Sequence, residues 1–260
     1  MKLPERRMRD AKGNEMTIST IDESQRKAAK VAGLAYLITV VIVVYVNFGI
    51  HERLIVANNA AETARNILAH ERLFRIGIVG DLVYCAGVVV RLTALYVILK
   101  PVSRGLALLA ALWRLVWVLM WLVMTLNLFG ALRLIRSADY LRAFEAERLQ
   151  ALARFYLGTS FDYYYVGLLF GALASTVCGY LWFKSGYIPR YLAVFGVISS
   201  AFCVTCTLVF YIFPNVDKIV NLWWFDTPMA IFDIVLSFWL LFKGLKPLAV
   251  SEVRAQAGAV

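Results

Sequence analysis

The sequence predicts an all-α integral membrane protein, a bundle of six transmembrane helices with two extracytoplasmic amphipathic helices. The composition is the first observation: 61% of the 260 residues are hydrophobic and 17% are charged, whereas soluble domains average roughly half and a quarter. The excess forms runs of about 20 apolar residues, the length that spans a bilayer core. Because backbone in lipid must satisfy its own hydrogen bonds, and because these runs lack the alternation of a barrel, each run is expected to be a helix.

The distribution of charge indicates the partner. The net charge is +10, but Lys and Arg cluster at the ends of the apolar runs, where lipid headgroups would lie. This pattern is typical of a protein in a bilayer and does not favour nucleic acid as a partner.

The chain divides into three parts. Residues 1–30 are predicted to be a polar, basic cytoplasmic segment, residues 31–246 the six-helix membrane domain, and residues 247–260 a cytoplasmic tail. The first apolar run is too long for a signal peptide and lacks a small-x-small cleavage site, so an uncleaved helix is expected. The six spans are predicted near Val31–Ile50, Ile76–Leu99, Gly105–Leu128, Leu157–Phe183, Tyr191–Phe213 and Phe225–Phe242.

Two connections are too long to be simple loops. In Asn58–Phe74 and in Asp139–Tyr156 the apolar residues fall on one helical face, which predicts two amphipathic helices, with Asp139 as an N-cap. The other connections and the two chain ends carry more Lys and Arg beside the spans. Both termini are therefore predicted to be cytoplasmic, with the amphipathic helices on the opposite side.

The sixth span carries a polar stripe. Asp226, Asp233 and Ser237 share one helical face, and Asp233 is predicted to lie near the bilayer midplane. Arg114 in the third span has a similar predicted depth. Because a lone charge is costly at the bilayer centre, the sequence predicts that Arg114 and Asp233 are partners.

Three further charges lie within spans. Asp81 and Asp162 are predicted to line the outer half of the same interior, and Arg91 is predicted to snorkel toward the cytoplasm. Together with Arg114, Asp226, Asp233 and Ser237, they form a candidate polar core. It would serve a ligand or proton pathway, or it would only fix helix register.

The fourth span carries Gly167, Gly171, Ser175 and Gly179 at strict four-residue spacing. Small residues at this period allow another helix to approach closely. An internal partner helix is favoured, and contact with a second chain is the alternative.

Aromatic side chains gather in two places. Asp162 precedes Tyr163, Tyr164 and Tyr165, which are predicted to anchor at the membrane interface, with a cation-binding vestibule as the alternative. Trp113, Trp117 and Trp121 form a stripe on the third span. This stripe is predicted to face lipid or the core, and the alternative is a stacked wall for a flat ligand.

The motifs of soluble enzymes are missing from the sequence. His51 and His70 each precede Glu-Arg-Leu, which is not the H-E-x-x-H zinc pattern, and no histidine falls inside a predicted span. Cys203 and Cys206 match C-x-x-C but lie in an apolar run, where small residues in a helix contact are the favoured interpretation. No metal, cofactor or catalytic residue is therefore predicted, and an enzyme is not favoured.

Several local motifs resemble an uncharacterised bacterial membrane family, domain-of-unknown-function family 4386. They are Asn66-Ile-Leu-Ala-His-Glu-Arg-Leu-Phe-Arg-Ile-Gly77 followed by Asp81-Leu-Val83, Leu99-Lys-Pro-Val-Ser-Arg104, Trp113-Arg-Leu115, Gly179-Tyr-Leu-Trp-Phe-Lys-Ser-Gly-Tyr-Ile-Pro-Arg190 and Trp239-Leu-Leu-Phe-Lys-Gly244. The resemblance covers about Arg26 to Lys246. It implies membrane helices in a bacterial inner membrane and no particular activity.

Three functional hypotheses follow. In the first, the polar core binds or passes a small solute, ion or proton. In the second, the chain is a structural or accessory subunit that contacts itself or another protein through membrane helices. In the third, paired aspartates act on a lipid, which requires Asp81 and Asp162 to converge.

Overall fold

The structure is a computed structural model that describes residues 7–9, 15–17, 21–56, 59–136, 144–213 and 223–246. Two short antiparallel strands, β1 (Arg7–Arg9) and β2 (Glu15–Thr17), lie early in the chain. The other regular elements are helices: α1 (Glu23–Val44), the π-helical η1 (Tyr45–His51), α2 (Glu52–Leu54), α3 (Ala60–Ala69), α4 (Glu71–Leu99), α5 (Arg104–Ile135), α6 (Ala146–Ser185), α7 (Arg190–Ile212), α8 (Trp223–Phe238) and the π-helical η4 (Trp239–Lys243).

The prediction of a six-span helical membrane protein is confirmed. Within the described residues, six helical segments are long and apolar enough to cross a membrane. Their outward side chains include many large apolar ones, as contact with lipid requires. The segments are Glu23–Leu54, Glu71–Leu99, Arg104–Ile135, Glu147–Ser185, Arg190–Ile212 and Trp224–Lys243.

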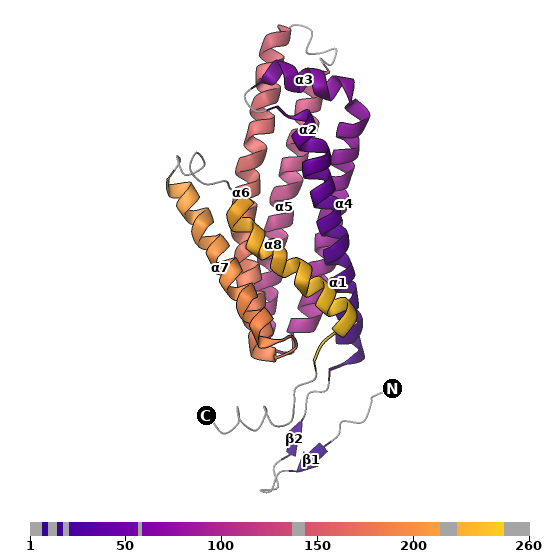
Figure 1. Cartoon of the computed structure of the whole chain (residues 1–260), viewed down its shortest axis with the longest axis vertical. Coiled ribbons are helices and arrows are strands. Elements are labelled where there is room, and N and C mark those ends of the chain that lie inside the picture. Colours follow the sequence, from indigo (N-terminus) through magenta and orange to yellow (C-terminus); the bar gives the residue numbers. More distant parts are fainter. Residues whose placement is uncertain are drawn as a thin grey trace.

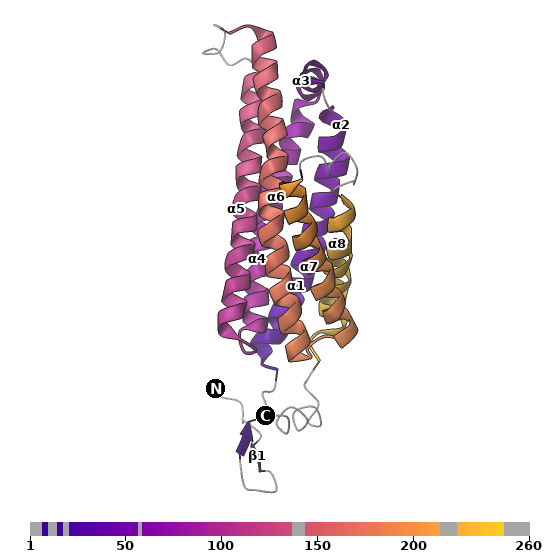
Figure 2. The same cartoon turned by 90° about the vertical axis from the view of Figure 1, so that its left-hand side faces the viewer.

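The long helices form a ring. Each packs against the next in the order α1, α4, α5, α6, α7 and α8, and α8 returns to α1. The short helix α3 lies across one end of this ring, against α6 and α5, as Figures 1 and 2 show. We call this end the α3 end. The opposite end, where α6 turns into α7 through residues 186–189, is the turn end.

Hydrogen bonds connect the chain segments at the turn end. The Gln25 side chain accepts from the Asp22 amide (3.1 Å) and donates to the Ile98 carbonyl (3.0 Å), which joins the start of α1 to the end of α4. The Lys246 amide donates to the Tyr187 carbonyl (2.8 Å), so the residues after η4 lie on the α6–α7 turn. The start of α1 and the end of η4 therefore lie at the same end of the bundle.

The helices differ in length, and this difference shapes the molecule. With a rise of about 1.5 Å per residue, α7 (23 residues) is about 35 Å long and fits a hydrocarbon core of about 30 Å. By the same rise, α5 (32 residues) and α6 (40 residues) reach about 48 Å and about 60 Å. In Figure 1 the excess length lies at the α3 end, above the ends of α7 and α8. This part of the bundle is too long to lie within hydrocarbon.

The second predicted amphipathic helix is not a separate element. Residues 146–156 are the first turns of α6, continuous with the span, and Asp139 lies outside the described residues. The first predicted helix is present as α3, which buries Ala64 and Ile67 but leaves Leu68 half exposed. The location of these segments outside the cytoplasm stays a prediction.

Glycines bring α4 close to α1. A Cβ atom added at Gly80 would lie 2.5 Å from Val46 Cγ2, and one added at Gly87 would lie 2.5 Å from Thr39 Cγ2. Such distances leave no room for a side chain on α4. This close contact was not predicted from the sequence, although the spacing of seven puts both glycines on one helical face.

Three apolar clusters fill the ring along its length. The turn-end cluster contains Trp182, Leu236 and Leu240, all almost fully buried. The middle cluster is built around aromatic residues of α4, α5 and α6, and the α3-end cluster around Ile50, Ile67 and other aliphatic residues. Arg91, Arg114 and Asp233 lie between the turn-end cluster and the middle cluster.

Candidate functional site

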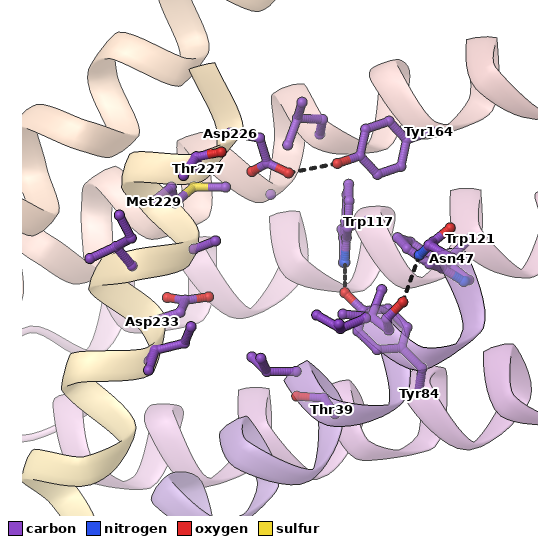
Figure 3. Close-up of a pocket in the computed structure, with 18 of the residues that line it drawn as sticks. Thr39, Asn47, Tyr84, Trp117, Trp121, Tyr164, Asp226, Thr227, Met229 and Asp233 are labelled. Carbon is purple, nitrogen blue, oxygen red and sulfur yellow. Dashed lines mark hydrogen bonds between the residues drawn. The ribbon is translucent and has the colours of Figure 1, made fainter. Parts of the chain in front are cut away.

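A cavity of about 340 Å³ lies inside the ring, beside the middle cluster. We call it the central cavity. It is bordered by α1, η1, α4, α5, α6 and α8, and Figure 3 shows Asp226 and Asp233 on its α8 side. Its polar and aromatic lining residues are Thr39, Asn47, Phe48, Tyr84, Arg91, Arg114, Trp117, Trp121, Tyr164, Asp226, Thr227 and Asp233.

Helical periodicity explains why these side chains meet. On most of the contributing helices the lining residues recur three or four positions apart, and on α4 they are seven apart, so on each helix they share a face. Examples are Thr39, Val43 and Asn47 on α1 and η1, Arg114, Trp117 and Trp121 on α5, and Asp226, Met229 and Asp233 on α8.

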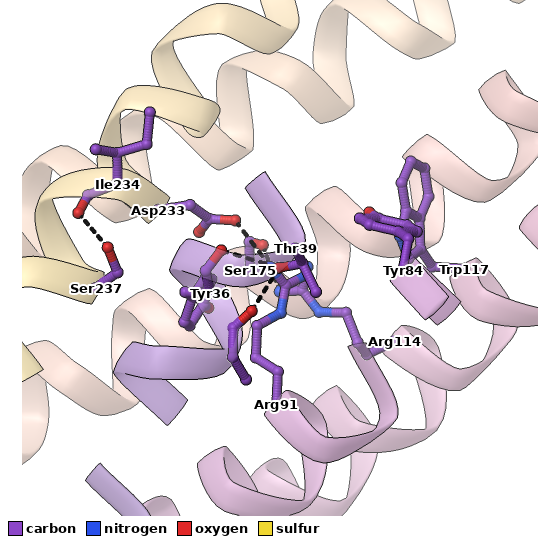
Figure 4. Close-up of polar contacts among 11 residues, drawn as sticks. Tyr36, Thr39, Tyr84, Arg91, Arg114, Trp117, Ser175, Asp233, Ile234 and Ser237 are labelled. Carbon is purple, nitrogen blue, oxygen red and sulfur yellow. Dashed lines mark hydrogen bonds and ion pairs between the residues drawn. The ribbon is translucent and has the colours of Figure 1, made fainter. Parts of the chain in front are cut away.

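At one end the cavity has a polar floor formed by Arg91, Arg114 and Asp233, and Ser175 is hydrogen-bonded to Arg114 (Figure 4). Arg91 Nη1 lies 3.6 Å from Asp233 Oδ2, and both side chains are largely buried. Arg114 Nη2 donates to Ser175 Oγ at 2.7 Å. The Arg91 guanidinium also lies over the Tyr36 ring, 4.2 Å from its centroid. The floor thus holds two guanidinium groups against one carboxylate.

The floor has unmet hydrogen-bonding capacity. Arg91 Nε and Asp233 Oδ1 are buried, and neither has a hydrogen-bond partner in the structure as described. A buried polar atom without a partner costs about 1–3 kcal/mol. The side chains of the floor therefore leave these two atoms unsatisfied.

Aromatic residues form a wall at the other end. Trp117 Nε1 donates to Tyr84 Oη (3.2 Å), and the Tyr84 and Trp121 rings pack with centroids 4.4 Å apart. Tyr164 meets Trp117 edge to face at 5.6 Å, and its hydroxyl donates to Asp226 Oδ2 at 2.7 Å. We call Tyr84, Trp117, Trp121 and Tyr164 the aromatic wall. On the cavity side, the carboxylate of Asp226 lies at the edge of this wall (Figure 3).

A second polar pair lies behind this wall. Asp81 Oδ1 accepts a hydrogen bond from Trp121 Nε1 (3.1 Å), and Asp81 Oδ2 faces His51 Nε2 at 3.8 Å. The His51 side chain is only 12% exposed. The expectation that no histidine lies among the spans is therefore wrong, because the first helix continues through η1 and carries His51 onto α4.

The predicted charge pairing needs correction. Asp233 pairs with Arg91 and not with Arg114, which instead bonds Ser175. Arg91 does not snorkel, because its side chain is 5% exposed and points into the ring. The sequence predicts only the depth of each arginine, and depth does not determine the direction in which each side chain faces.

The other predicted core residues are divided between the interior and the surface. Asp81 is buried, but Asp162 is exposed, so these two carboxylates do not converge as the lipid-enzyme hypothesis requires. Asp226 lines the cavity with Asp233. Ser237 is buried one turn nearer the turn end, where its hydroxyl donates to the Ile234 carbonyl at 2.6 Å.

The small residues of α6 contact other helices of the same chain. Gly167 and Gly171 face the Trp117 ring of α5, and a Cβ at Gly179 would lie 2.9 Å from Val197 Cγ2 of α7. Ser175 provides the acceptor for Arg114. The stripe therefore brings the aromatic wall and the polar floor against α6.

Two predictions about aromatic residues have different outcomes. Tyr165 is buried and Tyr164 reaches the cavity, so their predicted role as interface anchors is wrong. Trp117 and Trp121 are buried, as a core stripe would be, and they also line the cavity.

All four cysteines are free, and Cys203 is buried in the middle cluster. No group of three His, Cys, Asp or Glu side chains gathers as a metal site would within the residues that the structure describes.

Four polar residues near the site were not predicted from the sequence: Tyr36, Thr39, Asn47 and Tyr84. The signal was present, because each interrupts an apolar run at helical spacing from another polar residue. Tyr84 precedes Arg91 by seven positions, and Thr39 precedes Asn47 by eight.

Comparisons with known proteins identify a family whose description names no activity. A family model described as "Domain of unknown function (DUF4386)" matches residues 31–244. No curated protein matches the chain, and no solved structure matches it.

Proposed function

The chain belongs to the DUF4386 family, whose description names no activity, and from the geometry of the chain itself we propose that it binds a small polar solute in the central cavity. The observation that carries the proposal is the polar floor. A cavity of this volume lies within the range of small-molecule sites, and it reaches Arg91, Arg114 and Asp233.

The floor supports solute binding better than a purely structural ion pair. In a structural pair each charge would be closed on its partner. Here Arg114 has no carboxylate within 4 Å among the described residues, and Arg91 Nε is buried without a hydrogen-bond partner. Each guanidinium offers five donors, so most of this capacity remains for a ligand.

The cavity favours entry from one side. Val44 and Ile231, and toward the α3 end Phe48 and Thr227, line the cavity and are also exposed, so the cavity opens to the surface between α1–η1 and α8. Toward the turn end, Trp182, Leu236 and Leu240 are packed and buried. We therefore propose that the solute enters from the α3 side, and that passage through the protein would require the turn-end cluster to open.

We further propose that the turn end faces the cytoplasm of a bacterial cell. The basic residues of the connections Lys100–Arg104 and Lys184–Arg190 lie there, and so do the ends of α1 and η4 that continue into the basic terminal segments. Basic residues beside membrane spans favour the cytoplasmic side. The α3 end would then be extracytoplasmic.

A matched pair of threonines tests whether the cavity admits solutes. Thr39 and Thr207 are both almost fully buried, and each hydroxyl donates to the carbonyl four residues earlier. Only Thr39 lines the cavity. In a chain whose four cysteines are replaced, we expect Thr39→Cys to react with a small water-soluble thiol reagent and Thr207→Cys to stay unreacted. Equal reactivity of the two positions would contradict the proposal.

A further inference from the structure

The charges around the central cavity are separated into two poles. At the floor, two guanidinium groups face one carboxylate, so the floor carries an unmatched positive charge. At the edge of the aromatic wall, Asp226 accepts from Tyr164 but has no Lys, Arg or His side chain within 4 Å among the described residues. Among the described residues, the second pole therefore carries an unmatched negative charge.

The floor has the chemistry of an anion site. Arg114 uses one of its donors on Ser175, and Arg91 keeps a buried Nε without a partner. Planar guanidinium groups bind carboxylate and phosphate oxygens through parallel hydrogen bonds. An anionic group placed between Arg91 and Arg114 would balance the excess positive charge.

The other pole has the chemistry of an organic-cation site. Asp226 lies beside Tyr164, whose ring packs at 5.6 Å from Trp117 and 5.9 Å from Trp121. Aromatic faces next to a carboxylate attract ammonium groups, including quaternary ones. Figure 3 shows Asp226 and Asp233 both directed to the space in front of this wall.

The two poles fit one molecule. Asp226 and Asp233 are seven residues apart on α8, which corresponds to about 10 Å along the helix. Asp233 marks the floor, because it pairs with Arg91. A ligand with one charge would leave the opposite pole unpaired in a membrane interior, where unpaired charge is costly.

Building on the proposed solute binding, we infer that the solute is a zwitterion, with its anionic group at Arg91 and Arg114 and its cationic group at Asp226 beside the aromatic wall. The cavity of about 340 Å³ accommodates such a molecule in an extended form. Charge complementarity at both ends would then determine its selectivity.

Three probes with the same carbon chain test this inference: trimethylammonio-hexanoate, hexyltrimethylammonium and hexanoate. Binding to the purified full-length protein is followed by tryptophan fluorescence, since Trp117 and Trp121 line the cavity. We expect the zwitterion to bind at least about tenfold more tightly than either single-charge probe, the effect of one charged hydrogen bond.

Single substitutions test which side chains form each pole of the site. Asp226→Asn should remove the advantage of the zwitterion over hexanoate, whereas Asp162→Asn, at an exposed carboxylate of the same membrane half, should retain it. Arg114→Gln should remove the advantage over hexyltrimethylammonium, whereas Arg133→Gln, at an exposed position of the same helix, should not. If Arg114→Gln fails to fold, Arg114→Lys replaces it; Lys keeps the charge without the planar fork, so the advantage should shrink without vanishing, and an unchanged advantage would contradict the guanidinium contact.

Equal affinities for the three probes, or binding of none of them at millimolar concentration, would overturn the zwitterion inference. If Thr39→Cys is still labelled in that case, the cavity admits solutes and the proposed function stands. An unlabelled Thr39→Cys would contradict both the zwitterion inference and the proposed solute binding.

Discussion

The guanidinium of Arg91 shows how a membrane interior accommodates charge. It meets Asp233 at 3.6 Å, lies over the Tyr36 ring and borders a cavity that offers room for a further polar group. A charge at this depth is tolerated because several partial contacts replace water, and none of them would be sufficient alone.

Removing the carboxylate of this pair should be costly. We expect Asp233→Asn to lower the free energy of unfolding by about 3–5 kcal/mol, because an unpaired guanidinium is left buried. The exposed Asp162→Asn should change it by at most about 0.5 kcal/mol. Unfolding in detergent can be followed by the reaction of buried Cys178 and Cys203 with a thiol-reactive dye.

Removing both charges provides the control. Arg91→Met combined with Asp233→Leu should cost less than Asp233→Asn alone, since no lone charge remains. If the double variant is the less stable of the two, the Arg91–Asp233 contact is not the interaction that Asp233→Asn breaks.

The Asp81 carboxylate supports the aromatic wall from behind, through its hydrogen bond from Trp121. Asp81→Asn keeps an oxygen acceptor for this N–H group, whereas Asp81→Leu leaves it buried and unpaired. We expect Asp81→Leu to destabilise the protein by about 1–3 kcal/mol and Asp81→Asn by clearly less, as measured in the same unfolding assay. Equal losses would show that the Trp121 contact contributes little.

Individual residues also show what a single sequence can predict about a site. Asp226, Asp233 and Arg114 were found because charge in an apolar run is conspicuous. The Arg91 partner was missed because pairing depends on helix rotation, which depth does not give. Thr39 and Tyr84 were missed because uncharged polar residues are common in membrane helices.

At the scale of elements, α6 is the helix on which the site is assembled. Its small residues receive Trp117 of α5 and Val197 of α7, and its Ser175 bonds Arg114. The four-residue spacing predicted tight packing from the sequence. The continuous helix from residue 146 was not predicted, because the hydropathy of residues 146–156 is that of a surface segment, while tertiary contacts extend the helix.

Two glycines of α6 give a matched test of this packing. A Cβ at Gly179 would lie 3.0 Å from the backbone nitrogen of Val197, whereas nothing lies within 4 Å of one at Gly158. We expect Gly179→Ala to destabilise the protein by about 1–3 kcal/mol through overpacking. Gly158→Ala should stabilise it by about 0.5–1 kcal/mol, the usual gain of Ala over Gly within a helix. Equal effects on the unfolding transition would contradict the close α6–α7 contact.

At the scale of the whole molecule, the closed ring of helices creates the cavity. The number and type of the spans could be predicted from hydropathy alone, and the six segments confirm this. The ring order could not be predicted, because apolar runs do not reveal their neighbours. The length of α5 and α6 beyond the bilayer could not be predicted either, since hydropathy marks only the part of a helix that lies in lipid.

The proposed orientation makes a prediction for the whole chain. In a cysteine-free background, Arg65→Cys in α3 should react with a membrane-impermeant thiol reagent added to intact cells. Lys27→Cys at the start of α1 and Lys246→Cys after η4 should react only after permeabilisation. All three positions are exposed. Labelling of Lys27→Cys and Lys246→Cys from opposite sides would contradict the bundle itself, and reversal of all three would contradict only its orientation.

The most direct test of solute binding is to fill the cavity. Ala230 and Val235 both lie at exposed positions of α8, but only Ala230 lines the cavity. Small molecules released on denaturing the purified protein are identified by mass spectrometry for the wild type, Ala230→Trp and Val235→Trp. We expect one polar species to be released from the wild type and Val235→Trp and to be lost from Ala230→Trp. The same species in equal amount from all three proteins, or none from the wild type, would contradict a solute site in the central cavity.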